Sequence, residues 1–140
     1  MKRMIVCLLT ASLLLTGCTQ NNMDFYPLDR DGMERLPYHQ IDQEQAMLMM
    51  EYDDGHVIVD VRRQDEYDAG HIPGAILIPV ESIAAEPPEK LPDREQIILI
   101  YCRSGNRSRQ AAQKLADMGY ENVYEFGGIL DWTGEIVSGE

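Results

Sequence analysis

The sequence predicts an α/β domain with a mostly parallel five-stranded sheet and helices on both faces. Short runs of Val, Ile and Leu alternate along the chain with segments of helical periodicity, as in sheets built from right-handed crossovers. The run at 97–101 is apolar without alternation, which is typical of a strand covered on both faces. With 140 residues, the chain has room for one such domain.

The first half of the domain is assigned from apolar runs and one helical stripe. Asp42 precedes the stripe and Gln45 follows three residues later, which predicts a helix that begins with a capping box. In chain order, the expected elements are a weak strand at 38–41, a helix at 42–52, a strand at 57–61, a short helical turn before Gly70 and a strand at 75–78.

The second half is assigned in the same way. Ala111, Leu115 and Met118 fall on one face of a helix that Gly119 ends. The expected elements are a short helix at 80–85, a strand at 97–101, a helix at 108–118, a strand at 122–126 that Gly127 and Gly128 break, and a closing helix at 129–137.

Cys102 stands between the fourth strand and the following helix. Backbone N–H groups at such a place can converge on an anion, and Arg103, Arg107 and Arg109 add positive charge, so the site favours a thiolate. A small buried core cysteine is the alternative, but an apolar pocket would not be edged with three arginines. Asp60 also ends a strand, so the same crevice is expected to include it.

The first residues predict export. Lys2 and Arg3 precede an apolar run at 4–15, which has the size of a signal-peptide core. The run ends in Leu-Thr-Gly-Cys at 15–18, which resembles the bacterial lipobox. A plain secretory signal, in which Cys18 is incidental, is the alternative. We expect a signal peptide at 1–17, a lipidated tether at 18–37 and a domain at 38–140, anchored to a bacterial membrane through Cys18 and lying outside the cytoplasm.

Composition excludes several functions. The net charge of −12 argues against a nucleic-acid partner. The cysteines lie at 7, 18 and 102, and their spacing does not suit a metal site. The histidines, His39, His56 and His71, are scattered along the chain, and we expect a surface or capping role for each. We therefore expect neither a metal nor another cofactor. Cys7 would leave with the signal and Cys18 would be blocked by lipid, so Cys102 would be the free thiol.

Four motifs carry a family resemblance. They are Asp60-Val61-Arg62 with Glu66-Tyr67, Gly70-His71-Ile72-Pro73-Gly74-Ala75, Cys102-Arg103-Ser104-Gly105-Asn106-Arg107-Ser108, and Phe126-Gly127-Gly128-Ile129 with Trp132. Over residues 38–137 the chain resembles a single-domain rhodanese, a sulfurtransferase. Phe126 departs from the aliphatic residue expected before the two glycines. The resemblance implies that Cys102 takes sulfur from a small anionic donor such as thiosulfate and passes it, as a persulfide, to cyanide or a thiol.

The resemblance also implies roles within the loop. Substrate binding falls to Arg103, Ser104, Gly105, Asn106, Arg107 and Ser108. Gly105 would permit a backbone curl that points amides inward, the arginines would bind the donor's anionic end, and the serines would hydrogen-bond sulfur or cap the helix. Asp60 and Arg62 would support the loop. Arg62 and Glu66, at i and i+4, are expected to form a salt bridge.

Two other functions remain open. Phosphatases and arsenate reductases of related fold use a Cys-(x)5-Arg loop, whereas Cys102 and Arg107 give Cys-(x)4-Arg, and the shorter loop suits a sulfur atom better than a tetrahedral phosphate. A catalytically quiet binding module at the cell envelope is the second alternative. The complete basic loop around Cys102 argues against it, because a quiet domain has no need of an activated thiol.

Overall fold

The computed structural model describes residues 36–139. The expected signal peptide, Cys18 and most of the tether lie outside these residues. The elements are β1 (His39–Gln40), α1 (Gln43–Met50), β2 (Val57–Asp60), α2 (Gln64–Ala69), β3 (Ile76–Leu77), the 3₁₀ turn η1 (Val80–Ser82), β4 (Ile97–Cys102), α3 (Asn106–Asp117), β5 (Asn122–Gly128) and the 3₁₀ turn η2 (Ile129–Asp131).

The strands form one sheet with the order β1-β5-β4-β2-β3, and all pairings are parallel. The central strand, β4, pairs with β5 over most of its length, from Ile97 opposite Asn122 to Cys102 opposite Gly128. A five-stranded parallel sheet with helices is the predicted fold class, which is confirmed.

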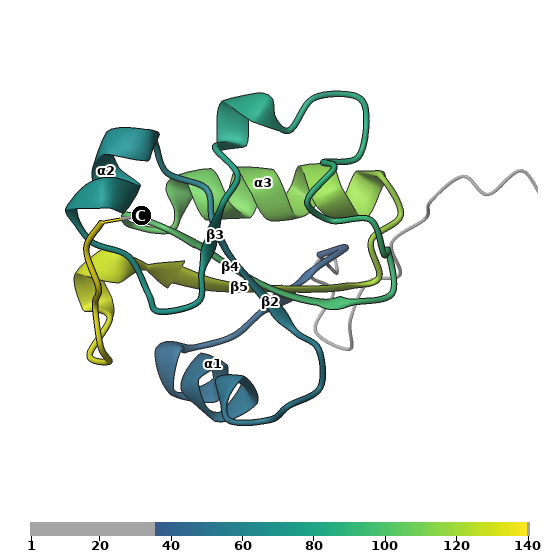
Figure 1. Ribbon diagram of the computed structural model, residues 1–140. Coiled ribbons are helices and arrows are strands. Elements are labelled where there is room, and N and C mark those ends of the chain that lie inside the picture. The colour runs from purple at the N-terminus through teal and green to yellow at the C-terminus, as the bar shows by residue number, and fades with distance from the viewer. Residues whose placement is uncertain (1–35, 140) are drawn as a thin grey trace, which may run out of the picture.

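Helices cover both faces of the sheet, with α1 on one side and α3 on the other (Figure 1). Side chains of β4 alternate between two apolar clusters. Ile98, Ile100 and Cys102 belong to the cluster that contains Leu115 of α3. Leu99 and Tyr101 belong to the opposite cluster, with Ala46 of α1, Tyr67 of α2 and Phe126. Because both faces of β4 are buried, its sequence shows no polar alternation.

The capping box predicted for the first helix is present. Asp42 Oδ1 accepts a hydrogen bond from the Gln45 backbone N–H at 2.8 Å, and Gln45 Oε1 accepts one from the Asp42 N–H at 3.0 Å. The two bonds satisfy backbone donors that would otherwise lack partners, and so fix the start of α1.

The helix predicted at 129–137 is wrong. Only the 3₁₀ turn η2 forms, and the chain then extends until Val137 pairs with His71 in an antiparallel bridge. The His71 N–H donates to the Val137 carbonyl at 2.8 Å, and the Val137 N–H donates back at 2.9 Å. Gly134 lowers the local helix propensity, and the pairing with His71 gives the backbone its hydrogen bonds in extended form. The helix predicted at 80–85 is likewise only the turn η1.

Candidate active site

Cys102 lies at the carboxyl end of β4, where only 1% of the residue is exposed. The chain then turns through Arg103, Ser104 and Gly105, and α3 begins at Asn106, two residues earlier than predicted. Gly105 has φ +99°, a left-handed conformation that favours glycine. This turn brings the Gly105 N–H to 3.0 Å from Cys102 Sγ. The loop therefore curls around the sulfur atom.

The environment of Cys102 favours its thiolate. Burial by itself would raise the pKa of Cys102, but hydrogen bonds from the side chain and backbone of Ser108 and from the N–H groups of Gly105 and Ser104 bring this pKa below its ordinary value. The loop thus stabilises an anion with amides and a hydroxyl, at a place that water barely reaches.

Strand β5 forms the floor of the loop. Its register with β4 shifts between Ile100 and Cys102, so that Cys102 lies opposite Gly128. The predicted break at the two glycines is therefore a bulge within the strand, with Gly127 at φ +89°. A Cβ atom on Gly128 would clash with the carbonyl oxygen of Arg103. Glycine is needed there because the loop backbone packs directly against it.

The Arg107 side chain is engaged in an ion pair. Its Nη1 and Nη2 atoms donate to the two carboxylate oxygens of Glu66 at 2.7 and 2.9 Å, which joins α3 to α2. The Arg107 hydrogen bond is the main cause that lowers the Glu66 pKa to about 2. The predicted Arg62–Glu66 salt bridge is wrong. The i,i+4 rule requires both residues on one helix, and Arg62 precedes α2.

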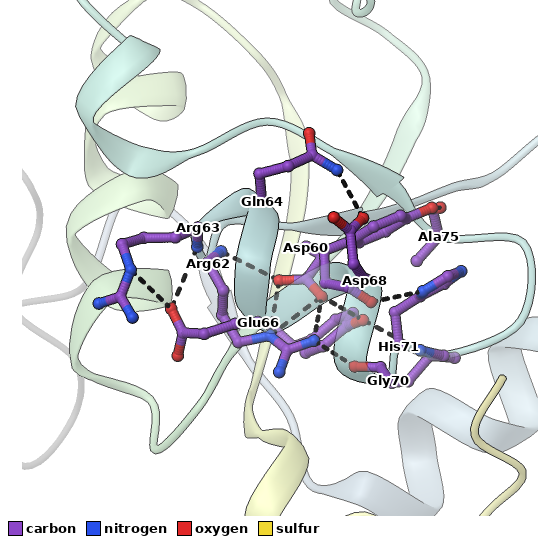
Figure 2. Close-up of polar contacts among 12 residues, drawn as sticks. Asp60, Arg62, Arg63, Gln64, Glu66, Asp68, Gly70, His71 and Ala75 are labelled. Carbon is purple, nitrogen blue, oxygen red and sulfur yellow. Dashed lines mark hydrogen bonds and ion pairs between the residues drawn. The ribbon is translucent and has the colours of Figure 1, made fainter. Parts of the chain in front are cut away.

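Arg62 pairs with Asp60 instead, in a buried network (Figure 2). Its Nε and Nη2 atoms donate to the Asp60 carboxylate at 2.9 and 2.6 Å, and Nη2 also donates to the Gly70 carbonyl at 2.7 Å. The Tyr101 hydroxyl donates to Asp60 Oδ2 at 2.7 Å and accepts from the Ile72 N–H. The network therefore ties the end of β2 to the segment at 70–72 and to Tyr101, the residue before Cys102.

Burial and hydrogen bonding act in opposite directions on this network. Burial by itself would lower the pKa of Arg62, but the hydrogen bonds and charge of Asp60 hold this pKa above its ordinary value. The pKa of Tyr101 is raised, first by burial and then by the negative charge of Asp60. Arg62 is therefore charged and Tyr101 neutral at physiological pH, as their hydrogen bonds require.

The remaining loop residues lie at the surface. Arg103, Ser104 and Asn106 are exposed, and Arg107 is half-buried. Asn106 Oδ1 accepts a hydrogen bond from Gln110 one helical turn further on, at 3.4 Å. Arg103 is thus the loop cation that stands open to solvent, next to the buried sulfur.

Comparison with known proteins identifies the fold and the loop together. The family model described as Rhodanese-like domain matches residues 42–135, which include β2, the Cys102 loop and the β5 bulge. This chain belongs to the rhodanese-like family. The matched residues include the strands of the parallel sheet from β2 to β5 and the cysteine at the carboxyl end of β4. They also include the loop whose Gly105 N–H points at that cysteine.

Relatives of this rhodanese-like chain include named sulfurtransferases. It is 36% identical over 73 residues to the thiosulfate sulfurtransferase PspE of Escherichia coli K12, covering 52% of this chain and 70% of that protein. It is 36% identical over 96 residues to a sulfurtransferase of Allochromatium vinosum, covering 68% and 88%. Such relatives support sulfurtransferase activity in general. Of some longer relatives, such as an adenylyltransferase and sulfurtransferase of Meyerozyma guilliermondii, the match covers only 21%.

Solved structures agree. A rhodanese with anions from E. coli superposes with a TM-score of 0.56 at 33% sequence identity, covering 60% of this chain and 99% of that one. A rhodanese-related protein from Thermoplasma volcanium gives a TM-score of 0.61 at 26% identity, covering 71% and 98%. These neighbours share the fold described above.

His71 was expected at the surface or as a cap, and the capping role is confirmed. It is buried, stacks on Tyr67 with 3.7 Å between ring centroids, and contacts the Tyr67 carbonyl, in the last turn of α2, through Nδ1. Glu125, on β5, is a part of the site that the sequence did not single out, and its carboxylate contacts Ser108 Oγ at 2.6 Å. A charged residue within the apolar strand at 122–126 was the signal that could have singled it out.

Within the part of the chain that the structure describes, no group of three His, Cys, Asp or Glu side chains is arranged to hold a metal ion. Over the same residues, no helix is long and apolar enough to cross a membrane.

Proposed function

We propose that this rhodanese-like protein transfers sulfane sulfur from an anionic donor such as thiosulfate to a thiol or cyanide, through a persulfide on Cys102. The main support is the geometry of the loop, which aims the Gly105 N–H at the Cys102 sulfur at 3.0 Å. Together with Ser104 and Ser108, this amide keeps the pKa of Cys102 below its ordinary value. The thiol is therefore ionised more readily, and the thiolate is the nucleophile.

The reaction has two displacements at sulfur. The Cys102 thiolate attacks the outer sulfur of thiosulfate, a new S–S bond forms, and the original S–S bond breaks with its electron pair leaving on sulfite. An acceptor thiolate or cyanide then attacks the terminal persulfide sulfur, and Cys102 leaves as a thiolate. Exposed Arg103 can meet the sulfonate end of the donor, while the loop amides hold the negative charge of the persulfide.

The assay for thiocyanate tests this function. The purified full chain, given thiosulfate and cyanide, should form thiocyanate, and Cys102→Ser should abolish it because a serine hydroxyl is a far weaker nucleophile at neutral pH. Cys7→Ser, the same change outside the domain, is the control and should retain activity. Activity that survives Cys102→Ser would contradict the assignment of the nucleophile. Hydrolysis of an aryl phosphate without thiocyanate formation would support phosphatase chemistry. The absence of both activities would support a quiet binding module.

We further propose that the protein is exported and held at a bacterial membrane by lipid on Cys18. The support is the sequence alone: a basic start, an apolar run of signal-peptide length and the lipobox-like residues at 15–18. Expressed in a bacterial host, the chain should sediment with membranes. Cys18→Ala should release it from the membranes into the soluble fraction. Cys7→Ala is the matched control and should leave it with membranes. An unchanged distribution for Cys18→Ala would overturn the lipid anchor.

A further inference from the structure

Gln43, the first residue of α1, has a side chain that the proposed sulfur transfer does not use. Its Nε2 atom donates hydrogen bonds to the Phe126 carbonyl at 2.7 Å and to the Gly128 carbonyl at 3.1 Å. These carbonyls lie on either side of Gly127, in the β5 bulge that forms the floor of the Cys102 loop. One side-chain amide thus joins α1 to both ends of the bulge.

The bulge needs hydrogen-bond donors from outside the sheet because the neighbouring edge strand has ended. β1 ends opposite Glu125, and the next N–H along the chain, that of Ile41, donates to the Glu125 carbonyl at 3.0 Å. The chain then leaves β5 and enters α1. Phe126 and Gly128 are buried, and a buried backbone carbonyl without a donor is costly. The Gln43 amide supplies the donors that a longer β1 would have provided.

The two carbonyls fix the orientation of the Gln43 amide. A carbonyl oxygen can only accept a hydrogen bond, so the NH₂ group must face the bulge. The Oε1 atom is then buried, and within residues 36–139 it has no hydrogen-bond partner. An unpaired buried acceptor costs free energy. The side chain keeps this orientation despite that cost, because its two bonds to the bulge hold it there.

The bulge in turn positions the Cys102 loop. A Cβ atom on Gly128 would clash with the Arg103 carbonyl, and one on Gly105 would lie 3.5 Å from Gly127 Cα. The backbone of the loop therefore packs directly against the backbone of the bulge. Within the loop, the Gly105 N–H donates to Cys102 Sγ at 3.0 Å. A displacement of the bulge would move this donor relative to the sulfur.

Gln43 and Cys102 belong to opposite faces of the sheet. α1 covers one face and α3 covers the other (Figure 1). Cys102 belongs to the apolar cluster on the α3 side, whereas Ala46 of α1 belongs to the opposite cluster. An influence of Gln43 on the sulfur therefore passes through β5 and does not depend on direct contact.

We propose that Gln43 is a positioning residue that braces the β5 bulge and thereby holds the Gly105 N–H at hydrogen-bonding distance from the Cys102 sulfur. Without its two hydrogen bonds, the carbonyls of the bulge must turn toward water or other donors, and the loop that packs on them shifts as well. A donor that moves away from the sulfur stabilises the thiolate less. The inference rests on the proposed use of Cys102 as the nucleophile.

The pH profile of Cys102 alkylation tests the inference without any sulfur donor. The full chain is treated with iodoacetamide over a range of pH, and mass spectrometry follows the peptide that contains Cys102. Gln43→Met keeps the length of the side chain and adds no charge, but its thioether cannot donate a hydrogen bond. We expect the midpoint of the profile to move to higher pH by about half a unit.

Gln64→Met is the matched control. Gln64 is likewise the first residue of a helix, α2, but it is exposed and donates to Asp68 of its own helix at 2.7 Å. The same substitution there should leave the midpoint unchanged. An equal shift in Gln64→Met would overturn the inference, because the effect would then not come from the bulge.

A second variant shortens the amide of Gln43 instead of removing it. Gln43→Asn lacks one methylene group, so its NH₂ group can no longer reach both carbonyls. The midpoint should move in the same direction by less, and this variant serves if Gln43→Met does not fold. A midpoint unchanged by both Gln43 substitutions overturns the inference, even where denaturant titration shows a loss of stability, because Gln43 would then support the fold without positioning the loop.

The two proposals fail in different ways. A chain that shows the shift yet forms no thiocyanate would contradict the proposed sulfur transfer alone. A chain that forms thiocyanate without the shift would contradict the role of Gln43 alone.

Discussion

Two arginine–carboxylate pairs flank the Cys102 loop, and they differ in burial and in what they join. In the Asp60–Arg62 pair the side chains are 0% and 6% exposed, and the pair is further bonded to Gly70 and Tyr101. In the Glu66–Arg107 pair the side chains are 15% and 25% exposed, and the pair joins α2 to the first turn of α3. The first is surrounded by protein, whereas solvent reaches the second.

The difference in burial predicts that the two pairs contribute differently to the stability of the fold. Removing one member of a buried pair leaves an uncompensated charge, which strongly destabilises the fold. A partly exposed pair contributes less to stability, because water solvates both charges when it opens. Under the proposed function, we expect the outer pair to open when an anionic sulfur donor competes for Arg107, while the inner pair holds the surrounding segments in place.

The largest expected effect comes from breaking the inner pair. Asp60→Asn leaves Arg62 buried without a carboxylate, so we expect the free energy of unfolding to fall by about 3–5 kcal/mol in denaturant titrations. Asp65→Asn is the matched control, because Asp65 pairs with Arg63 at the exposed surface and should cause no measurable loss. Equal losses for the two variants would show that burial does not distinguish these pairs.

Breaking the outer pair should affect donor binding more than stability. Glu66→Gln removes the charge that neutralises Arg107, so we expect the KM for thiosulfate to fall about two- to fivefold, with a smaller loss of stability than Asp60→Asn causes. Steady-state kinetics and denaturant titration measure the two quantities. Asp65→Asn, on the same helix, should change neither. A higher KM in Glu66→Gln would mean that Glu66 holds Arg107 in place for the donor.

The smallest effect is the pH dependence of the outer pair. Because the pKa of Glu66 is lowered from 4.5 to about 2, the carboxylate stabilises the folded state fully above pH 4.5, and this contribution is lost as the pH falls toward 2. The stability difference between the wild type and Glu66→Gln should shrink over this window, because glutamine does not titrate. A constant difference between pH 6 and pH 2.5 would contradict the assignment of Arg107 as the partner.

Local patterns predicted most of the fold. The apolar run at 97–101 became β4, and the stripe of Ala111 and Leu115 became the buried face of α3. The capping box at Asp42 formed as expected, because its bonds join residues only three apart. The closing helix failed for the opposite reason, since its end pairs with His71, which lies far away in the sequence.

By itself, the sequence determined the strand, the cysteine and the glycine-containing turn into a helix, because these follow from periodicity and from residues that are neighbours along the chain. The tertiary structure alone decided which charged groups surround that cysteine. Arg107 and Glu66 are 41 positions apart, and Ser108 and Glu125 are 17 apart. Such contacts arise from the order of the strands in the sheet and from the bulge in β5. Neither the strand order nor the bulge can be read from the spacing of residues along the chain.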